Sequence, residues 1–353
     1  MFGGCRRVGA VLALLLGSVT TSITTPAWAC GCGAYIPDHK GASVVDERAL
    51  IAWDGSREDI LMALRVTGDS DSAAWVMPVP SAAQVSLGEA EAFTELGRLT
   101  APRIEYRDSW WPTFSWLTTD EPSEGALAGA SPGGANVLGR QRIGPFDVTR
   151  LAAQDPAELA KWLTDNGFPH PDGLDANLAP YVAARWEIVA VKLAPAAQGQ
   201  SLTGDLQPLR LSFASGEAVY PMRLSRSASA PQTVDLFVLA DHRMVPTSMP
   251  VADNAPTLEF AGRIEGSTVS PALAEFVGDE AFLTRWTNNL IEPTSIDGDY
   301  LFEPAADDTA YQQVVYRERN RGDVTGVALL AVIGLGSLAL VVALVRRRRS
   351  VSA

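Results

Sequence analysis

The chain ends in an uncharged stretch, residues 324–345 (VTGVALLAVIGLGSLALVVALV), followed at once by Arg346, Arg347, Arg348 and Arg349. As a helix, these 22 residues rise about 33 Å, which matches a hydrocarbon core of about 30 Å. The stretch has no polar face, as a buried helix of a soluble domain would have. It therefore predicts a transmembrane helix, and the arginines predict a cytoplasmic tail at residues 346–353.

The N-terminus has the three parts of a signal peptide. Arg6 and Arg7 precede an apolar run, residues 8–19 (VGAVLALLLGSV), which is too short to span a bilayer. A polar stretch then ends in Ala27-Trp28-Ala29, where small residues suit a signal peptidase. We expect residues 1–29 to be removed and the protein to lie at the cell membrane, with its N-terminal region outside.

The charge of the exported region is strongly acidic. The chain has 28 basic and 41 acidic residues, and six arginines lie in the two terminal segments. The region between them keeps 22 basic against 41 acidic residues, a net charge of −19. Such a surface repels phosphate backbones, so we expect no nucleic-acid partner. An acidic surface also keeps an exported protein soluble.

The exported region, residues 30–302, alternates between strand and helix patterns. Strands are expected at 49–53, 60–66, 73–80, 185–193, 209–213, 219–224 and 234–239. Helices are expected at 89–99, from Asp155-Pro156 to Gly167, from Ser270-Pro271, and from Asp279 to about Asn289. Two prolines in 73–80 favour a sheet edge or an exit from the sheet. The pattern predicts an α+β, strand-rich domain with several short helices.

Two segments interrupt this pattern. Residues 109–142 include a Gly/Ala/Ser/Pro-rich stretch without periodicity, which is typical of a long loop and is a possible boundary between two lobes. Residues 303–323 are polar with a few apolar positions, and we expect them to form a stalk between the domain and the membrane.

Two cysteines remain after the signal peptide, in the sequence Cys30-Gly31-Cys32. An oxidising compartment favours a disulfide between Cys30 and Cys32. The small ring would be strained, so a redox role is an alternative. Zinc would need four ligands, and only His39 lies nearby. We favour a structural disulfide.

Aromatic residues cluster at Trp110, Trp111, Phe114 and Trp116. If exposed, they would be candidates for contact with a sugar, a peptide or a membrane. If buried, they belong to the core, which is the interpretation we favour from the sequence. The three histidines, His39, His170 and His242, have no metal-binding spacing and are expected on surface loops.

Several motifs resemble those of a bacterial family of exported, singly anchored proteins known as a domain of unknown function. The string Trp75-Val76-Met77-Pro78-Val79-Pro80 is the most specific of them. The others are Cys30-Gly31-Cys32, Glu47-Arg48-Ala49-Leu50-Ile51, Trp53-Asp54-Gly55, Trp162-Leu163, Asn166-Gly167, Tyr181, Lys192, Pro208-Leu209 and Tyr220-Pro221-Met222-Arg223-Leu224. The resemblance implies location and architecture and brings no catalytic residues.

These observations favour a non-enzymatic envelope protein that binds a partner protein or a cell-surface component. The alternatives are a thiol–disulfide protein that uses Cys30 and Cys32, and a cell-wall hydrolase that uses carboxylates. We expect no catalytic residues, no cofactor and no metal site, and we expect the C-terminal helix to contact the membrane.

Overall fold

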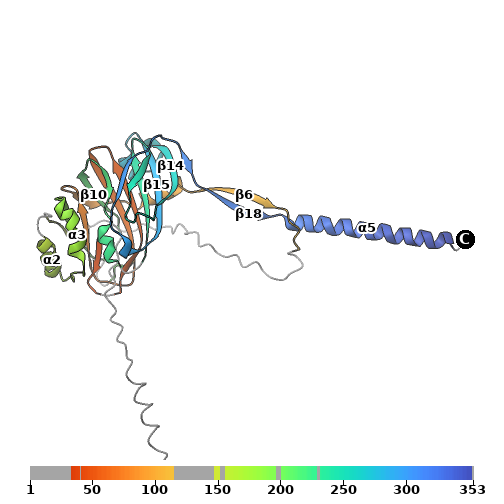
Figure 1. The fold of residues 1–353 in the computed structure, drawn as a ribbon, viewed down its shortest axis with the longest axis horizontal. Helices are drawn as coiled ribbons and strands as arrows, with labels where there is room; N and C mark the ends of the chain where they lie inside the picture. Colours follow the sequence, from red (N-terminus) through yellow and green to blue (C-terminus); the bar gives the residue numbers. More distant parts are fainter. Residues whose placement is uncertain are drawn as a thin grey trace, which may run out of the picture.

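The fold is described from a computed structural model, which describes residues 33–39, 41–114, 147–151, 156–195, 200–228 and 231–351. Figure 1 shows three parts in a line: a strand-rich head, a two-stranded ribbon, and the long helix α5 (Gly322–Val351). The expected α+β class, rich in strands and ending in an apolar helix, is confirmed.

In the described part of the chain, the strands of the head form three sheets. The largest has the order β17(Tyr311–Gln312)-β14(Thr257–Glu265)-β15(Glu280–Ile291)-β12(Gln232–Ala240)-β2(Ser43–Trp53)-β3(Arg57–Thr67)-β10(Leu209–Ala214)-β5(Gln84–Leu87), with β9(Gly204–Asp205) beside β3. The second has the order β1(Ala34–Pro37)-β4(Ala73–Val79)-β8(Glu187–Leu193)-β7(Asp147–Leu151), and the third β11(Ala218–Tyr220)-β16(Tyr300–Pro304)-β13(Met244–Ser248).

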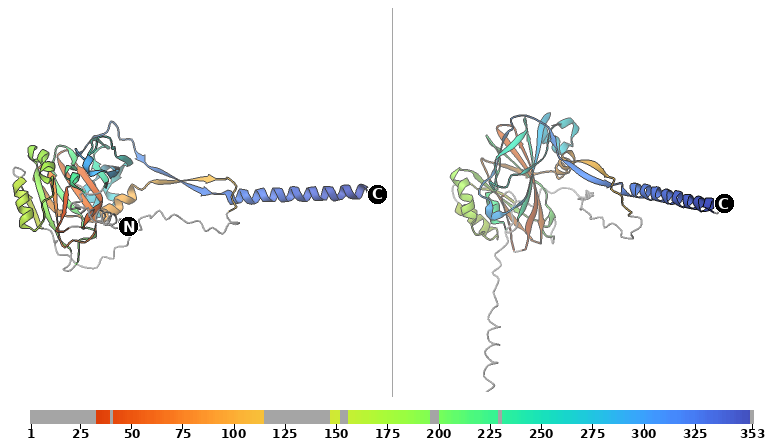
Figure 2. Two further views of the ribbon diagram at one scale, coloured as in Figure 1. Left: turned by 60° about the horizontal axis from the view of Figure 1, so that its bottom comes forward. Right: turned by 45° about the vertical axis from the view of Figure 1, so that its right-hand side comes forward.

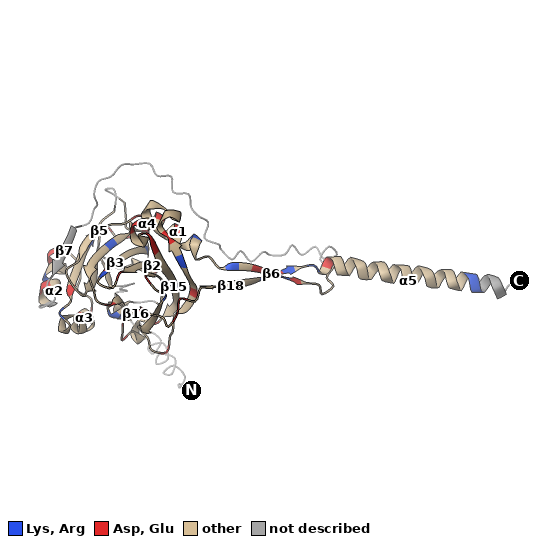
Figure 3. Ribbon diagram, turned by 90° about the horizontal axis from the view of Figure 1, so that it is seen from above, with Lys and Arg blue, Asp and Glu red and all other residues tan. Residues whose placement is uncertain are grey.

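Four short helices cover the outer faces of the two larger sheets. These are α1(Glu91–Leu99), α2(Pro156–Asp165), α3(Leu174–Ala183) and α4(Pro271–Val277). Among the described residues, 3-10 helix also occurs at η2(Arg223–Ser227), η3(Gly266–Thr268) and η4(Pro293–Ser295). Helices α2 and α3 lie at one end of the head in Figure 1, while Figure 3 shows α1 and α4 on another side.

Alternating side chains divide the head into layers. On β4, Trp75 faces the main core between the sheets, while Val76 faces α2 and α3. On β2, Ile51 faces the same main core, while Leu50 faces α1 and α4. Because β4 buries side chains on both faces, its sequence is a continuous hydrophobic run, and the same holds for the last five residues of β2, 49–53.

The hairpin of β2 and β3 turns at Asp54-Gly55, as expected. One carboxylate oxygen of Asp54 accepts the backbone N–H groups of Ser56 at 2.9 Å and Arg57 at 2.8 Å. Gly55 has φ of +92°, a conformation that costs glycine little. The turn therefore fixes the position of Trp53, the last residue of β2.

An edge position is one of two expectations for residues 73–80, and the sheet order corrects it, since β4 lies between β1 and β8. The other, an exit from the sheet, agrees with the end of β4 at Val79, directly before Pro80. Pro78 is nevertheless tolerated, because one of its two sides is unpaired, as on an edge strand. Strand β1 pairs with Ala73 to Val76 only, so Pro78 lies beyond the end of β1 and needs no N–H on that side.

The helix expected from Asp279 to Asn289 is wrong, because this segment belongs to strand β15, which lies between β14 and β12. Pairing on both sides satisfies its backbone groups, and its β-branched and aromatic side chains suit a sheet. The other helices are confirmed at α1, at α2 with Gly167 after it, and at α4 with Pro271 at its first position. Residues 152–155, including Asp155, lie outside the described residues.

The ribbon joins two segments that are far apart in the chain. Strand β6 (Arg103–Ser109) pairs in parallel with β18 (Val314–Asn320), from Arg103 beside Val314 to Ser109 beside Asn320. Seven residues at about 3.3 Å each make the ribbon about 23 Å long. Both strands run from the head toward α5, as all views show. The segment 303–323 thus supplies β17 to the head and β18 to the ribbon.

Candidate functional site

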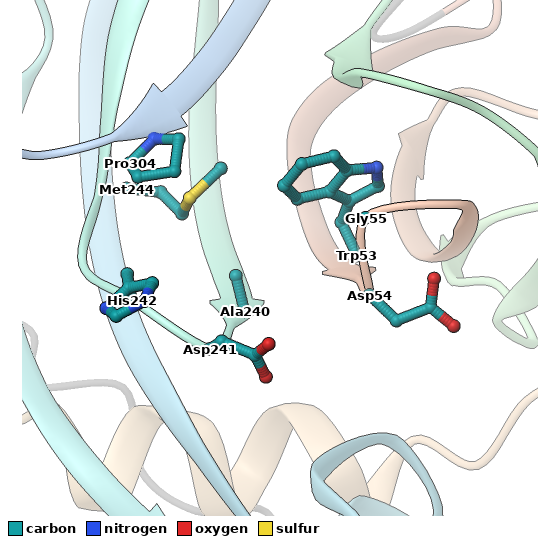
Figure 4. A pocket seen from close by; sticks show the side chains of 8 residues that line it. All are labelled: Trp53, Asp54, Gly55, Ala240, Asp241, His242, Met244 and Pro304. Atoms are coloured by element: carbon teal, nitrogen blue, oxygen red, sulfur yellow. The ribbon is translucent and has the colours of Figure 1, made fainter.

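A small hollow of about 90 Å³ lies where three segments of the head meet. The turn Trp53-Asp54-Gly55 forms one side, and Asp241-His242, which follows β12, forms the other. Figure 4 shows Met244 and Pro304 across from the Trp53 ring, with Ala240 and Asp241 below them. The turn Trp53-Asp54-Gly55 is one of the motifs that carried the resemblance in the sequence.

Hydrogen bonds hold the apolar walls of this hollow in place. The indole N–H of Trp53 donates to the Ser215 carbonyl at 3.2 Å. Met244 is fully buried, and its backbone N–H donates to the Thr284 hydroxyl while its carbonyl accepts from the Trp286 indole. The walls are therefore built into the sheets and are preformed.

The rim of the hollow is acidic. The backbone N–H groups of Ser56 and Arg57 hold the pKa of Asp54 below its usual range, so Asp54 is ionised at neutral pH. Asp241 is the second carboxylate at the rim. His242 pairs with Asp308 instead of its sequence neighbour, at 3.1 Å.

Asp308 holds the outer side of the rim together. It accepts the backbone N–H of Arg243 and the guanidinium of Arg263, each at 2.8 Å. The Arg243 N–H is the main cause of its lowered pKa, and His242 and Arg263 add to it. The rim therefore combines two carboxylates, Asp54 and Asp241, with a histidine that an ionised partner orients.

The size of the hollow decides what it can accommodate. Sites for whole small-molecule substrates are usually about 300–1,000 Å³. A hollow of 90 Å³ accepts a single side chain or a group of similar size. Apolar walls with carboxylates at the rim suit an amphipathic cation, whose methylene stem packs on Trp53 while its charge meets the rim.

Beneath this region, Glu58 is fully buried beside Trp53 in the β2–β3 pairing. Burial raises the pKa of Glu58 well above its usual range; the Val219 N–H, which it accepts, acts in the opposite sense. Its Oε1 has no hydrogen-bond partner. A second buried carboxyl, Glu47 in the middle of β2, accepts the Tyr220 hydroxyl. The two carboxyls face the core and do not form a pair.

A further polar cluster centres on Asp299 and unites motifs that the sequence had shown separately. Its carboxylate accepts the Tyr181 hydroxyl and the backbone N–H groups of Met222, at 2.7 Å, and Arg223. Arg223 also donates from its side chain at 3.1 Å. These bonds tie helix α3 to the segment after β11, so the cluster is structural.

The residues singled out in the sequence are not brought together at the hollow. Cys30, Cys32 and Trp116 lie outside the described residues. Trp110 and Trp111 are 54 % and 81 % exposed, so the expectation that they are core residues is wrong. They lie at the far end of the ribbon, beside α5. Whether these aromatics contact a ligand stays a prediction, as does the disulfide.

The histidines are on the surface, as expected. His39 pairs with Asp38 and His170 with Asp175, in the same way that His242 pairs with Asp308. Across the part of the chain that the structure describes, no group of three or more His, Cys, Asp or Glu side chains is arranged to hold a metal ion. Asp241 was not predicted as a site residue, because only the folded chain brings it to the rim of the hollow.

Comparison with known proteins identifies a family. The profile of a family described as uncharacterized protein conserved in bacteria (DUF2330) matches residues 26–303. None of the curated proteins matches the chain. Among solved structures, baculovirus P35 aligns at 7 % identity over 75 % of this chain and 98 % of that chain. Its TM-score of 0.36 is too low to carry an argument.

Proposed function

The chain belongs to the DUF2330 family of bacterial proteins, and on that premise we propose that it is a membrane-anchored envelope protein whose head binds a partner protein. Helix α5 is the anchor, since Gly322–Arg347 is long and apolar enough to cross a membrane. The most apolar part of this helix is not buried against the rest of the protein. The arginines after it stay in the cytoplasm, which places the head outside.

The observation that carries this proposal is the position of the head. A two-stranded ribbon, about 23 Å long at about 3.3 Å per residue, separates it from the helix. Figure 2 shows the ribbon between the head and α5. Such a spacer lifts the head clear of lipid headgroups and leaves its surface accessible to other envelope components. A partner-binding role makes use of this presentation, whereas an enzyme acting on lipid would be held away from its substrate.

We further propose that the partner inserts a lysine or arginine side chain into the hollow beside Trp53. Asp54 and Asp241 supply the negative charge at its rim. The net charge of −19 over residues 30–323 adds a long-range attraction for a basic partner surface.

Photo-crosslinking in the native bacterium tests this proposal. A photoreactive residue replaces His242, whose side chain is 61 % exposed at the rim, in the full-length protein. His170, which pairs with Asp175 of α3 and does not line the hollow, carries the same residue in the control. We expect a light-dependent adduct from position 242 that is absent from position 170.

The charge at the rim supplies the second arm. Asp241→Lys combined with the crosslinker at 242 should reduce the adduct about tenfold, since a charge-assisted hydrogen bond contributes about 1.5–3 kcal/mol. Asp172→Lys, beside α3, is the matched charge reversal and should leave the yield unchanged. An adduct of equal yield in the presence of Asp241→Lys would contradict binding at the hollow. No adduct from 242 would contradict partner binding through this face.

A further inference from the structure

The segment after β6 bends onto the first turns of helix α5. The Thr113 backbone N–H donates to the Gly322 carbonyl at 3.0 Å, and its hydroxyl bonds to Asp323 at 3.1 Å. In return, the Thr325 hydroxyl donates to the Trp110 carbonyl at 2.8 Å. Residues 110–114 are therefore fastened to the beginning of the apolar helix; we call them the aromatic loop.

Two glycines allow this close contact. A Cβ atom on Gly322 would lie 2.2 Å from the Trp111 carbonyl oxygen, and one on Gly326 would lie 2.2 Å from that of Thr113. The Phe114 ring also lies against Gly326, within 3.3 Å of the same position. The loop therefore lies directly on the backbone of the helix at residues 322–326.

The two tryptophans of the loop are left exposed. Trp111 is 81 % exposed and Trp110 is 54 % exposed, although both are large and apolar. Neighbouring exposed aromatics on a fixed loop are unusual in a soluble surface and mark a contact with something outside the described chain.

The level of the loop identifies what it contacts. Trp110 is bonded to Thr325, the second residue of the apolar stretch 324–345. That stretch is about 33 Å long against a hydrocarbon core of about 30 Å, so its first residues lie at the membrane surface. Charged residues lie on the other side of the loop, where Arg321 and Arg319 pair with Asp108 at 3.6 and 4.0 Å.

Toward the membrane, the charged residues come first, then the two indole rings, and then the apolar helix. Membrane proteins show this order across the headgroup layer, because indole rings favour that interface. We propose that the aromatic loop is a second membrane contact, in which Trp110 and Trp111 insert into the headgroup region of the bilayer next to helix α5. This inference rests on the proposed anchoring role of α5. It adds a membrane-contact site contributed by a segment more than 200 residues earlier in the chain.

Fluorescence quenching by brominated lipids tests this site. The full-length protein is reconstituted in phosphatidylcholine vesicles with bromine atoms either near the headgroup or near the chain ends. The emission of the two indoles is the difference between wild type and the Trp110→Phe, Trp111→Phe variant, which keeps an aromatic ring at each position. We expect this difference to be quenched about twofold more by the shallow bromines, as for indoles at the interface.

Flotation of the same vesicles separates the two proposals. If wild type floats with the lipid but the difference emission responds only to aqueous acrylamide, the loop proposal is overturned and the anchor stands. If the protein does not float, both are overturned. Trp162→Phe, in α2 at the opposite end of the head, serves as the matched control, and the emission it removes should not respond to either lipid.

Discussion

The guanidinium of Arg107 lies 3.6 Å from the centre of the Tyr316 ring, across the two strands of the ribbon. A second such contact, Arg319 over Tyr106 at 4.4 Å, runs in the opposite direction between the same strands. Because side chains alternate along a strand, the two contacts lie on opposite faces. The ribbon is thus clamped on both faces where it has no core to support it, and isolated two-stranded ribbons are marginally stable.

Replacing both tyrosines with alanine, Tyr106→Ala and Tyr316→Ala, should loosen the ribbon without unfolding the head. Each exposed cation–π contact contributes about 0.5–1 kcal/mol. Amide exchange over β6 and β18 should therefore rise by about tenfold, since 1.4 kcal/mol corresponds to a factor of ten. Hydrogen exchange followed by mass spectrometry measures the change in each strand.

The control is Tyr311→Ala, on the neighbouring strand β17, where the ring is also exposed. It should leave exchange in β6 unchanged. If the double variant exchanges at the wild-type rate, the ribbon is held by its backbone hydrogen bonds alone.

The Asp299 cluster should be one of the most sensitive sites in the head. Asp299→Ala removes the acceptor for the buried Tyr181 hydroxyl and for two backbone N–H groups. Leaving buried donors unpaired costs about 1–3 kcal/mol each, so we expect a loss of at least about 2 kcal/mol in the free energy of unfolding. Urea unfolding of the full-length protein in detergent measures it.

Asp297→Ala, two residues earlier, is the matched control. The backbone carbonyl of Asp297, which the variant keeps, accepts from Arg223. Its unfolding free energy should change by less than about 0.5 kcal/mol. Equal losses in the two variants would show that the segment, and not the carboxylate, provides the stability.

Glu58 should give the head an unusual dependence on pH. Its folded pKa is raised by burial, so the folded state keeps a proton that the unfolded state has lost above about pH 4.3. Stability contributed by this group is present below the unfolded pKa, falls as pH rises toward the folded pKa, and is constant above it. Glu58→Gln removes the titration, so wild-type stability should fall relative to the variant by about 1.4 kcal/mol per pH unit in that window.

Urea unfolding of wild type and Glu58→Gln between pH 4 and 8 gives the difference directly. Parallel curves for the two proteins would mean that Glu58 is hydrated or paired in solution and keeps an ordinary pKa.

Asp54 should behave in the opposite sense. Hydrogen bonds from the Ser56 and Arg57 backbone lower its folded pKa, so its contribution is present above the unfolded pKa of about 3.9 and is lost as pH falls through the folded value. Asp54→Asn should therefore lower Tm at pH 7, and the difference from wild type should shrink steadily as pH falls below the unfolded pKa of about 3.9. Thermal unfolding at pH 7 and at a series of lower pH values measures it, and a constant difference would contradict the assignment.

The sequence predicted the elements whose signals are local. The uncharged stretch 324–345, the Asp54-Gly55 turn and the Pro271 helix start each depend on neighbouring residues, and the structure has the helix, the hairpin and α4 where they were expected. The helix predicted from Asp279 to about Asn289 was wrong, because the segment is strand β15. This strand is stabilised by β14 and β12 on either side, and this tertiary pairing is invisible in the segment itself.

The ribbon and the hollow could not be found from local patterns. Strand β6 pairs with a strand more than 200 residues away in the sequence. Tyr106 and Tyr316 are exposed, so the sequences around them have the polar character of an ordinary surface loop. The hollow requires Trp53, Asp241 and Pro304 from three distant segments. The sequence shows Trp110 and Trp111 as part of an aromatic cluster, but their exposure depends on the contact of the aromatic loop with α5.

The parallel pairing of β6 and β18 also limits how the head can turn. A single extended strand rotates about two torsion angles per residue, so a head on one strand would face every direction in turn. Two hydrogen-bonded strands cannot rotate separately, and the aromatic loop ties the free end of β6 to α5. Rotation of the head about the axis of α5 is therefore restricted. A partner in the envelope would meet the head in one orientation relative to the membrane-spanning helix.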